Sequence, residues 1–486
     1  MLLNRGGLHS NLTDIRALVN MMSNSNLFLV LLSVVCLRPE QIAEGSRILI
    51  SSPYGTKSYH NMYVPLATEL ARRGHHVTII TNYGSSELDN LDNVRQIVMD
   101  KLLVDMSSYE NAFEAMLSVK VLLNSARIAL KNLFDLSLNI TNILYEDERI
   151  KDLMTNDHFD LVMVGITLNA GSYPLAWHFK APLVMLTPNA IYPGVMDALG
   201  DDDQTSFVPF FLGRYSNKMN LFERTLNTIA TKMYSYFIHQ YHQSAIQSII
   251  RKEPVPDCPH PRELEKNISL VLTNTHPAVN YARPMPPVIV EVGAMHCRPA
   301  KPLPEDLETF VSHPDGFILF AVGSTLPMER MPDFMIQSFI KTSAKIPQRI
   351  VWQWKGKVRD DLPDNVLALP WLPQQDLLGN VIKSLKSLNT NCIITLLGHE
   401  NCKLFITHGG LNSIFEAVYH GVPILGLPFG TDQKLNMRKA VEEGYARRIF
   451  WPDLSHELLS EAIGDMLHNP RYIKISYQRQ SLVTLF

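Results

Sequence analysis

The most informative part of the chain is the segment from Phe405 to Gln433, in which an apolar run is followed by a glycine pair, a helical stretch and a second apolar run. The run Leu404–Ile406 suits a strand of a parallel sheet that is buried on both faces. Gly409 and Gly410 then allow a tight reversal with no bulky side chain in the way. A ligand can therefore approach the main chain closely at this turn.

The residues after the glycines predict an anion site at the start of a helix. Asn412 and Ser413 stand where unpaired backbone N–H groups and the positive end of the helix dipole meet. His408 adds a donor suited to a pyrophosphate. Glu416, about one helical turn beyond Asn412, is an acceptor suited to the hydroxyls of a ribose.

Two further features offer places for a sugar and for a base. The run Ile424–Leu427 predicts a second strand, and its carboxyl end, where open α/β sheets bind ligands, delivers Asp432 and Gln433. Upstream, Trp371 lies in a proline-stiffened turn, where an indole is a stacking surface for a flat ring. Singly, the glycine turn indicates plain packing, the acid and amide a solvated loop, and the indole a core aromatic; their order favours a nucleotide-sugar site.

The stretch Trp371–Gln374 followed by the block His408–Gln433 resembles the donor-binding signature of the UDP-glycosyltransferases, in particular the UDP-glucuronosyltransferase-like enzymes of insects. The similarity extends more loosely from Arg47 to Arg471. It implies a GT-B fold, in which two facing Rossmann-like α/β domains enclose a cleft. It also implies a UDP-sugar as donor substrate, with no separate cofactor and no metal.

The same resemblance assigns the site residues. It implies that Trp371 and Gln374 hold the uracil and the ribose end, that Glu416 holds the ribose, and that Asp432 and Gln433 hold the sugar. The phosphates would be bound at the glycine turn by His408, Gly410, Asn412 and Ser413. Ser324, after the apolar run Phe317–Ala321, would be a further phosphate contact or, alternatively, an ordinary strand-to-helix cap.

In the related enzymes the sugar's configuration is inverted, and a histidine after the first strand takes the acceptor proton with the help of a carboxylate. The candidate for this base is His60, although an ungapped count back from Gly74 puts Tyr59 at the family position. The acid is expected where Gly165 stands, and Asp160 lies about 16 Å too early along an extended strand.

The predicted function is therefore an inverting transfer of glucose or glucuronate from a UDP-sugar to a hydroxyl of a small lipophilic acceptor. The cluster from Phe207 to Leu212 suits an apolar acceptor wall, or equally an ordinary core. The altered base and acid positions favour, as an alternative, a catalytically silent protein that binds UDP-sugars or lipophiles.

The length of 486 residues predicts two domains. An N-terminal acceptor domain is expected over residues 45–282, a proline-rich linker over 283–304, and a UDP-sugar-binding domain over 305–486. A helix is expected over Tyr63–Arg73, with a C-terminal cap at Gly74. Strands are expected at Arg47–Ser51, Val77–Thr81, Phe159–Val164, Leu183–Leu186 and Leu270–Thr273, and near Phe317, Arg349, Val366, Leu404 and Ile424.

Composition disfavours other classes of function. The formal net charge is -3, with no basic cluster dense enough to follow a nucleic-acid backbone. Neither glycine turn has the spacing of a dinucleotide-binding loop, which disfavours a nicotinamide enzyme. Asp201–Asp203 is interpreted as a solvated loop rather than a metal site. The cysteines within the predicted domains, Cys258, Cys297 and Cys402, are too few for a disulfide framework.

Residues 1–44 are expected to be an extension followed by a secretory signal. The apolar run Leu27–Leu37 is too short to span a bilayer but suits the core of a signal peptide, or alternatively a buried helix. Translation is expected to start at Met21 or Met22. The chain would then enter the lumen of the endoplasmic reticulum, where Asn139 and Asn267 are glycosylation sequons.

Two departures from the family pattern concern the gene. Leu377-Leu378-Gly379 recurs as Leu396-Leu397-Gly398, and removing residues 380–398 restores a family-like sequence, so this stretch is expected to be a retained intron or an alternative splice. The family ends in a membrane-spanning helix, whereas this chain stops at Phe486. A truncated form of a membrane-anchored enzyme is therefore expected.

Overall fold

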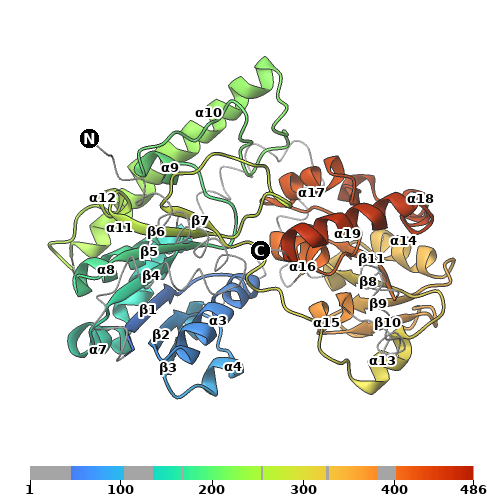
Figure 1. The fold of residues 1–486 in the computed structure, drawn as a ribbon, viewed down its shortest axis with the longest axis horizontal. Coiled ribbons are helices and arrows are strands. Elements are labelled where there is room, and N and C mark those ends of the chain that lie inside the picture. The colour runs from blue at the N-terminus through green and yellow to red at the C-terminus, as the bar shows by residue number, and fades with distance from the viewer. Residues whose placement is uncertain are drawn as a thin grey trace, which may run out of the picture.

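The computed structural model describes residues 45–102, 135–166, 168–252, 255–323, 328–379 and 401–484. Over these ranges the chain forms two all-parallel β-sheets with helices packed around them, one sheet in each half of the molecule (Figure 1). The predicted signal segment within 1–44, the site residue Ser324 and the predicted insert 380–398 lie outside the described residues.

The first sheet has the strand order β3-β2-β1-β4-β5-β6-β7. Its order reverses between β1 and β4, so the loops that follow these two strands diverge and leave a crevice at the carboxyl edge of the sheet. The strands are β1 Arg47–Ser52, β2 His76–Thr81, β3 Val94–Val98, β4 Leu161–Gly165, β5 Leu183–Thr187, β6 Ile268–Thr273 and β7 Ile289–Glu291. Its helices are α3 Lys57–Arg72, α4 Ser86–Asp89, α7 Glu148–Asn156, α8 Tyr173–Phe179, α9 Val195–Ala198, α10 Leu221–Phe237, α11 Gln243–Ile250 and α12 Pro261–Glu265.

The second sheet has the order β10-β9-β8-β11-β12-β13, with its reversal between β8 and β11. The glycine turn follows β11 and therefore stands at this reversal, where open α/β sheets bind ligands. The strands are β8 Phe317–Ala321, β9 Arg349–Gln353, β10 Val366–Leu369, β11 Cys402–Thr407, β12 Ile424–Gly426 and β13 Ala446–Arg448. Its helices are α13 Glu305–Val311, α14 Asp333–Ser343, α15 Gln374–Leu378, α16 Leu411–Tyr419, α17 Gln433–Glu442, α18 His456–His468 and α19 Pro470–Thr484.

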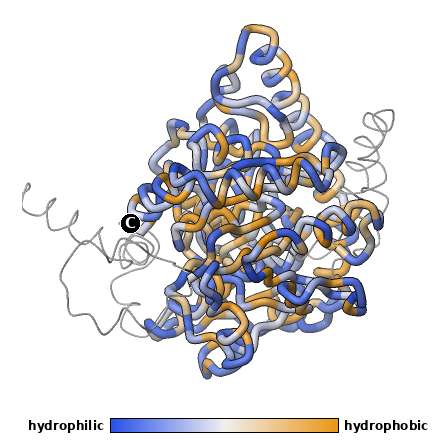
Figure 2. Tube along the Cα trace, turned by 90° about the vertical axis from the view of Figure 1, so that its right-hand side faces the viewer, coloured by the Kyte–Doolittle hydropathy of each residue, from blue (hydrophilic) through white to orange (hydrophobic). Residues whose placement is uncertain are grey.

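Both sheets are buried on their two faces, which explains why their strands have continuous apolar runs. In β1, Leu49 packs into one apolar cluster while Ile48 and Ile50 pack into another. In β8, Leu319 and Phe320 divide between two clusters in the same way. Figure 2 shows apolar stretches running through the inside of the molecule, while apolar and hydrophilic stretches alternate along its outer segments. The predicted α/β class with two parallel-sheet domains is confirmed.

The predicted strands are all present, but three short ones were not predicted: β3, β7 and β13. Strand β7 pairs with β6 in the first sheet although it lies inside the stretch 283–304 that was predicted as a linker. Helix α3 begins at Lys57, six residues before the predicted start at Tyr63. The helix therefore includes Tyr59 and His60 and fixes the directions of their side chains.

Helix α10 projects from the first half of the molecule and continues through a π-helical turn, Ile238–His242, into α11 (Figure 1). It exposes large apolar side chains, namely Leu221, Phe222, Leu226, Ile229, Met233, Tyr236 and Phe237. Within the described ranges, no helix has the length and apolar character needed to cross a membrane. Cys258, Cys297 and Cys402 are free thiols.

Candidate active site

The turn after β11 is shaped by glycines that make room for His408. Gly409 has a φ of +79°, a conformation that favours glycine, and a Cβ there would meet the side chain of Met437. A Cβ on Gly410 would lie 2.5 Å from Nε2 of His408, and a Cβ on Gly323 would lie 2.7 Å from Cε1 of the same ring. The imidazole thus packs between the turns that follow β8 and β11.

The start of helix α16 carries unpaired backbone donors. Gly410 occupies the capping position and has no side chain to accept the first N–H groups. The first backbone hydrogen bond of the helix runs from Ile414 N to the carbonyl of Gly410. The preceding N–H groups and the positive end of the helix dipole are therefore available to an anion. Burial lowers the pKa of His408 to about 4, so its ring is a neutral donor at pH 7.

Gln374 and Glu416 meet where a ribose was predicted to bind. The Gln374 amide donates to Oε2 of Glu416 (2.5 Å) and to the hydroxyl of Ser413 (3.3 Å). His296, which was not among the predicted residues, lies 3.6 Å from Oε1 of Glu416. Burial raises the pKa of Glu416 to about 7, so the carboxyl changes charge near neutral pH.

Trp371 lies on the loop between β10 and α15, and 57% of its surface is exposed. The alternative of a core aromatic is therefore excluded. The indole ring contacts the opposite half of the molecule, because the ammonium group of Lys57 lies 4.1 Å from the ring centroid. This is a cation–π contact across the cleft.

Asn412 links the two halves through its side chain. Its Nδ2 donates to the carbonyl of Ser58 at the start of α3 (2.8 Å), and its Oδ1 accepts from Asn274 (2.9 Å). The side-chain amide that was predicted to bind phosphate is thus engaged between the domains, while its backbone N–H stays at the open end of α16.

Residues of the proline-rich stretch hold helix α15, which carries Gln374, in place. Arg298 binds both carboxylate oxygens of Asp376 (2.5 and 3.0 Å), and its backbone N–H donates to Gln375. Gln375 in turn donates to the carbonyl of His296 (3.1 Å). These contacts fix the position of Gln374, the first residue of the helix.

Asp432 and Gln433 have different surroundings. Asp432 faces the interdomain cavity and accepts from Thr431 (3.0 Å) and Asn436 (2.9 Å). The side-chain oxygen of Gln433 accepts from the backbone N–H groups of Phe429 and Gly430 (2.8 and 3.0 Å). Gln433 therefore shapes the loop beside the cavity.

A cavity with about 940 Å³ of empty space, part of it open to solvent, lies between the two halves. Phe210, Phe211 and Tyr192 form an aromatic wall in which Tyr192 and Phe211 pack edge to face, with ring centroids 5.1 Å apart. Asp432 and Lys439 of α17 line the same cavity. An apolar wall and the predicted sugar position thus share one cavity.

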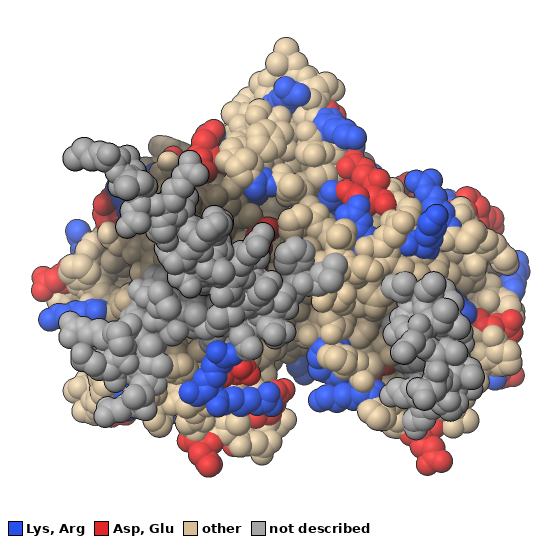
Figure 3. Space-filling model, in the orientation of Figure 1, with Lys and Arg blue, Asp and Glu red and all other residues tan. Residues whose placement is uncertain are grey.

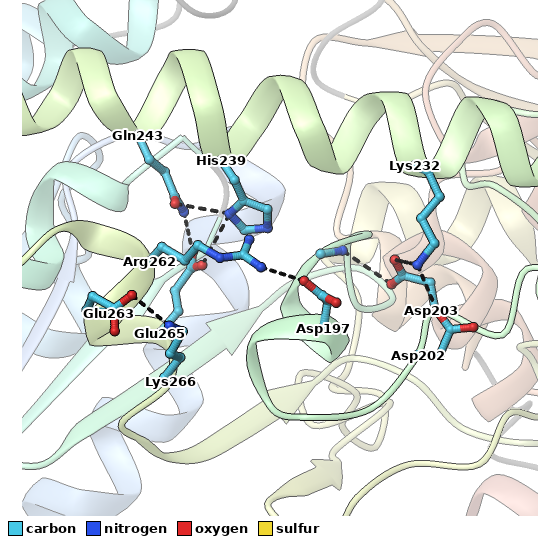
Figure 4. A network of polar contacts seen from close by, with 11 residues as sticks. Asp197, Asp202, Asp203, Lys232, His239, Gln243, Arg262, Glu263, Glu265 and Lys266 are labelled. Atoms are coloured by element: carbon cyan, nitrogen blue, oxygen red, sulfur yellow. Dashed lines mark hydrogen bonds and ion pairs between the residues drawn. The ribbon is translucent and has the colours of Figure 1, made fainter.

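Polar contacts hold the segment that contains Asp197 and the cavity residue Asp203 (Figure 4). The backbone N–H of Gly194 donates to Asp203 (3.2 Å), Lys232 of α10 pairs with Asp202 (2.7 Å), and Arg262 pairs with Asp197 (2.5 Å). Asp203 is buried against the cavity, so the interpretation of Asp201–Asp203 as a solvated loop is wrong for this residue.

The comparisons with known proteins agree with this geometry. The family model described as UDP-glucoronosyl and UDP-glucosyl transferase matches residues 49–383 and 392–482. The chain belongs to this family. The match leaves out residues 384–391, which fall inside the predicted insert.

Among its curated relatives is a UDP-glucosyltransferase 2 of Dactylopius coccus, 28% identical over 91% of this chain and 81% of the relative. A UDP-glucuronosyltransferase 2A3 of Cavia porcellus is also 28% identical, over 84% and 75%. Solved structures with the same fold include a glycosyltransferase of kitacinnamycin (TM-score 0.59, 16% identity, 90% of this chain and 95% of that one) and a calicheamicin glycosyltransferase (TM-score 0.56, 16% identity, 90% and 94%). The GT-B fold and the family's general chemistry, sugar transfer from a UDP-sugar, therefore apply to this chain.

The two candidates for the base of this UDP-glycosyltransferase point in different directions. The His60 ring is buried, its Nδ1 lies 2.9 Å from the hydroxyl of Thr81, and it is absent from the cavity lining. The Tyr59 hydroxyl accepts a hydrogen bond from Asn189 (3.0 Å), which is a cavity residue. The charge of Asp432 contributes to the raised pKa of Tyr59. His60 as base stays a prediction, and its position does not favour it.

The position of the family acid is filled by other groups. A Cβ on Gly165 would lie 2.7 Å from the hydroxyl of Ser52 and 2.8 Å from that of Tyr63. Asp160, the other carboxylate near this strand, accepts from the backbone N–H of Arg47 (2.8 Å) and so anchors the start of β1. Neither Gly165 nor Asp160 supplies a carboxylate to the cavity.

Arg283 is a cavity residue that sequence reasoning missed, because it lies in the stretch predicted as a linker. Its Nε and Nη2 are buried and have no hydrogen-bond partner among the described residues. Burial lowers its pKa, while the charges of Asp203 and Asp201 act in the opposite direction. A guanidinium group in this state is suited to an incoming carboxylate.

The raised pKa of Glu416 predicts how UDP binding depends on pH. The carboxylate accepts hydrogen bonds from a diol only when ionised, and with a pKa of about 7 it is protonated as the pH falls. UDP affinity should therefore fall about tenfold between about pH 8 and pH 6. Calorimetric titrations at both pH values check this. Glu416→Gln is the control, since it retains only the pH dependence of the UDP phosphate. Equal pH dependence in the two proteins would contradict the role of Glu416.

Proposed function

We propose that the protein is an inverting glycosyltransferase that transfers a hexosyl group from a UDP-sugar to a hydroxyl of a small lipophilic acceptor. The observation that carries this proposal is the convergence, at one sheet edge, of an exposed indole, the Gln374–Glu416 pair and the uncapped start of α16. Asp432 continues this line into a cavity with an aromatic wall. The site thus offers neighbouring positions for a nucleotide base, its phosphates, a sugar and an apolar acceptor.

The chemistry is a single displacement. The acceptor oxygen forms a bond to the anomeric carbon while the bond from that carbon to the phosphate oxygen breaks, which inverts the configuration and releases UDP. His408 and the free N–H groups of α16 would stabilise the charge on the leaving diphosphate. The hydroxyl proton of the acceptor passes to a base or to solvent.

For this base we retain His60 as the predicted residue and set Tyr59 against it. Burial lowers the pKa of His60 to about 4, so the ring is neutral at pH 7 and only weakly basic. Burial raises the pKa of Tyr59 well above its usual value, so its phenol keeps its proton. Either residue would be a weak base, and slow turnover is expected.

The donor sugar is proposed to be glucuronate rather than glucose. The supporting observation is Arg283, whose unpaired guanidinium N–H groups line the same cavity as Asp432. A bidentate contact from arginine to a carboxylate is among the stronger polar interactions in proteins. A neutral glucose offers those N–H groups only hydroxyl oxygens, which lack the charge and the bidentate geometry of a carboxylate.

We propose the lumen of the endoplasmic reticulum as the location. The support comes from the apolar run within residues 1–44 and from the two sequons. Asn139 and Asn267 are both exposed, as attachment of a glycan requires.

Charged groups of both signs are scattered over the face in Figure 3, with no broad basic patch to suggest a nucleic-acid partner.

Product formation tests the proposal. The purified protein is incubated with a panel of phenols and either UDP-glucuronate or UDP-glucose, and conjugates are measured by mass spectrometry. We expect conjugates, with a preference for glucuronate that falls about tenfold or more in Arg283→Gln, since a charge-assisted pair is lost. Loss of turnover in His60→Ala with retention in Tyr59→Phe would assign the base to His60, and the reverse to Tyr59.

The alternative is a catalytically silent protein that binds UDP-sugars or lipophiles. It is favoured by one observation, the replacement of the family base and acid positions by Tyr59 and Gly165. UDP binding without any conjugate, for either donor and the whole acceptor panel, would support this alternative.

A further inference from the structure

Lys57 occupies the surface on which the base of the donor was predicted to stack. Its ammonium group lies 4.1 Å from the centroid of the Trp371 ring and joins the N-terminal half to the C-terminal half. A cation–π contact at an exposed site is weak, and stacking of a nucleobase on an aromatic ring is as strong or stronger. A base can therefore displace the ammonium group from the indole.

The stem of Lys57 is anchored at the other end of the donor site. The next residue, Ser58, gives its carbonyl to the side chain of Asn412 at the open end of α16 (2.8 Å). From this anchor the flexible side chain of Lys57 reaches to Trp371. The side chain of Lys57 thus lies at the predicted base position, while the next residue contacts Asn412 at the predicted phosphate position.

The phosphate position needs a positive charge that its other groups do not provide. His408 is neutral at pH 7, because burial lowers its pKa to about 4. Arg298, whose charge acts on Glu416, is held by both oxygens of Asp376. In the part of the chain that the structure describes, Lys57 has no carboxylate partner within ion-pair distance, so its charge is available to a diphosphate.

We propose that Lys57 is a donor-binding residue that leaves the indole of Trp371 when the base stacks there and pairs with the diphosphate instead. The inference rests on the proposed donor site and adds a residue from the opposite domain to it. The exchange also carries a cation to the oxygen that leaves, where negative charge develops during transfer. Lys57 thereby links the N-terminal half to a diphosphate bound in the C-terminal half.

Uridine and UDP distinguish this role, because uridine can take only the base position. Lys57→Met retains the length of the side chain but removes its charge. UDP should bind about tenfold more weakly to this variant, since a charge-assisted contact is lost. Uridine should bind with equal affinity or about two- to threefold more tightly, since the competing ammonium group is gone. Lys57→Arg should bind UDP within about threefold of the original chain, because the positive charge is retained.

Calorimetric titrations of uridine and UDP into the full chain and its variants measure these affinities. Lys341→Met, a change at an exposed lysine of α14, is the matched control and should alter neither affinity. Weaker binding of UDP by Lys57→Met, with uridine bound equally well or more tightly, supports the proposal. Equal weakening of both ligands, or no change in UDP affinity, would overturn it and leave the donor site intact. Failure of the original chain to bind UDP would overturn the donor site and this inference together.

Discussion

Replacing Tyr59 with histidine should raise kcat for a phenolic acceptor about 100-fold, the lower end of what a positioned general base contributes. The Tyr59 hydroxyl lies beside Asn189 on the cavity side, but its raised pKa keeps it protonated at pH 7. An imidazole with a pKa nearer neutrality could take the acceptor proton from the same position. The gain stays at the lower end because Gly165 offers no carboxylate to orient the ring.

Initial rates at saturating UDP-sugar check this prediction. In Tyr59→His the rate should rise with pH through a pKa below the ordinary 6.5 of histidine, because the burial that raises the pKa of Tyr59 lowers the pKa of an imidazole at this position. Tyr59→Phe is the matched control and should turn over at the rate of the original chain if the phenol takes no part. An unchanged rate in Tyr59→His would contradict this prediction, and loss of the original activity in His60→Ala would then assign the role of base to His60.

A methyl group at Gly410 should weaken UDP binding about 100-fold. The new Cβ would lie 2.5 Å from Nε2 of His408, which is closer than real Cβ contacts, so the imidazole or the start of α16 must move. Loss of two charge-assisted hydrogen bonds to the diphosphate, each worth about 1.5 kcal/mol, corresponds to about this factor.

Gly464→Ala is the matched control for Gly410→Ala. It makes the same change within α18, where a Cβ would meet nothing within 4 Å. UDP affinity should stay the same in this variant, and the free energy of unfolding should rise by up to about 1 kcal/mol, because alanine favours a helix over glycine. Titration calorimetry and thermal unfolding measure both. Tight UDP binding by a folded Gly410→Ala protein would contradict the assignment of the turn after β11 as the phosphate site.

Much of the fold could be predicted because both sheets are buried on two faces. Strands such as β1 and β8 then carry apolar runs that are visible in the sequence. The strands that were missed lack this signal: β3 alternates weakly and lies at an edge, and β13 consists of Ala-Arg-Arg. Strand β7 lies among prolines, whose pattern predicts a linker, whereas the structure pairs this strand with β6.

In the donor site too, contacts between residues close in the sequence could be predicted, whereas contacts between distant residues could not. Gly409, Gly410 and Glu416 lie within one turn and one helix, so their spacing predicts their arrangement. The contact of Lys57 with Trp371 and the use of Asn412 as an interdomain bridge join residues hundreds of positions apart, which no local pattern reports. The early start of α3 also decides that Tyr59, and not His60, lies beside the cavity residue Asn189.

The central claim is that the C-terminal half forms a binding site for UDP, and titration calorimetry on the folded full chain tests it most directly. We predict saturable binding of one UDP per chain, which Glu416→Ala weakens and which NAD does not reproduce. A flat titration with UDP, on protein whose cooperative unfolding shows that it is folded, would contradict the claim.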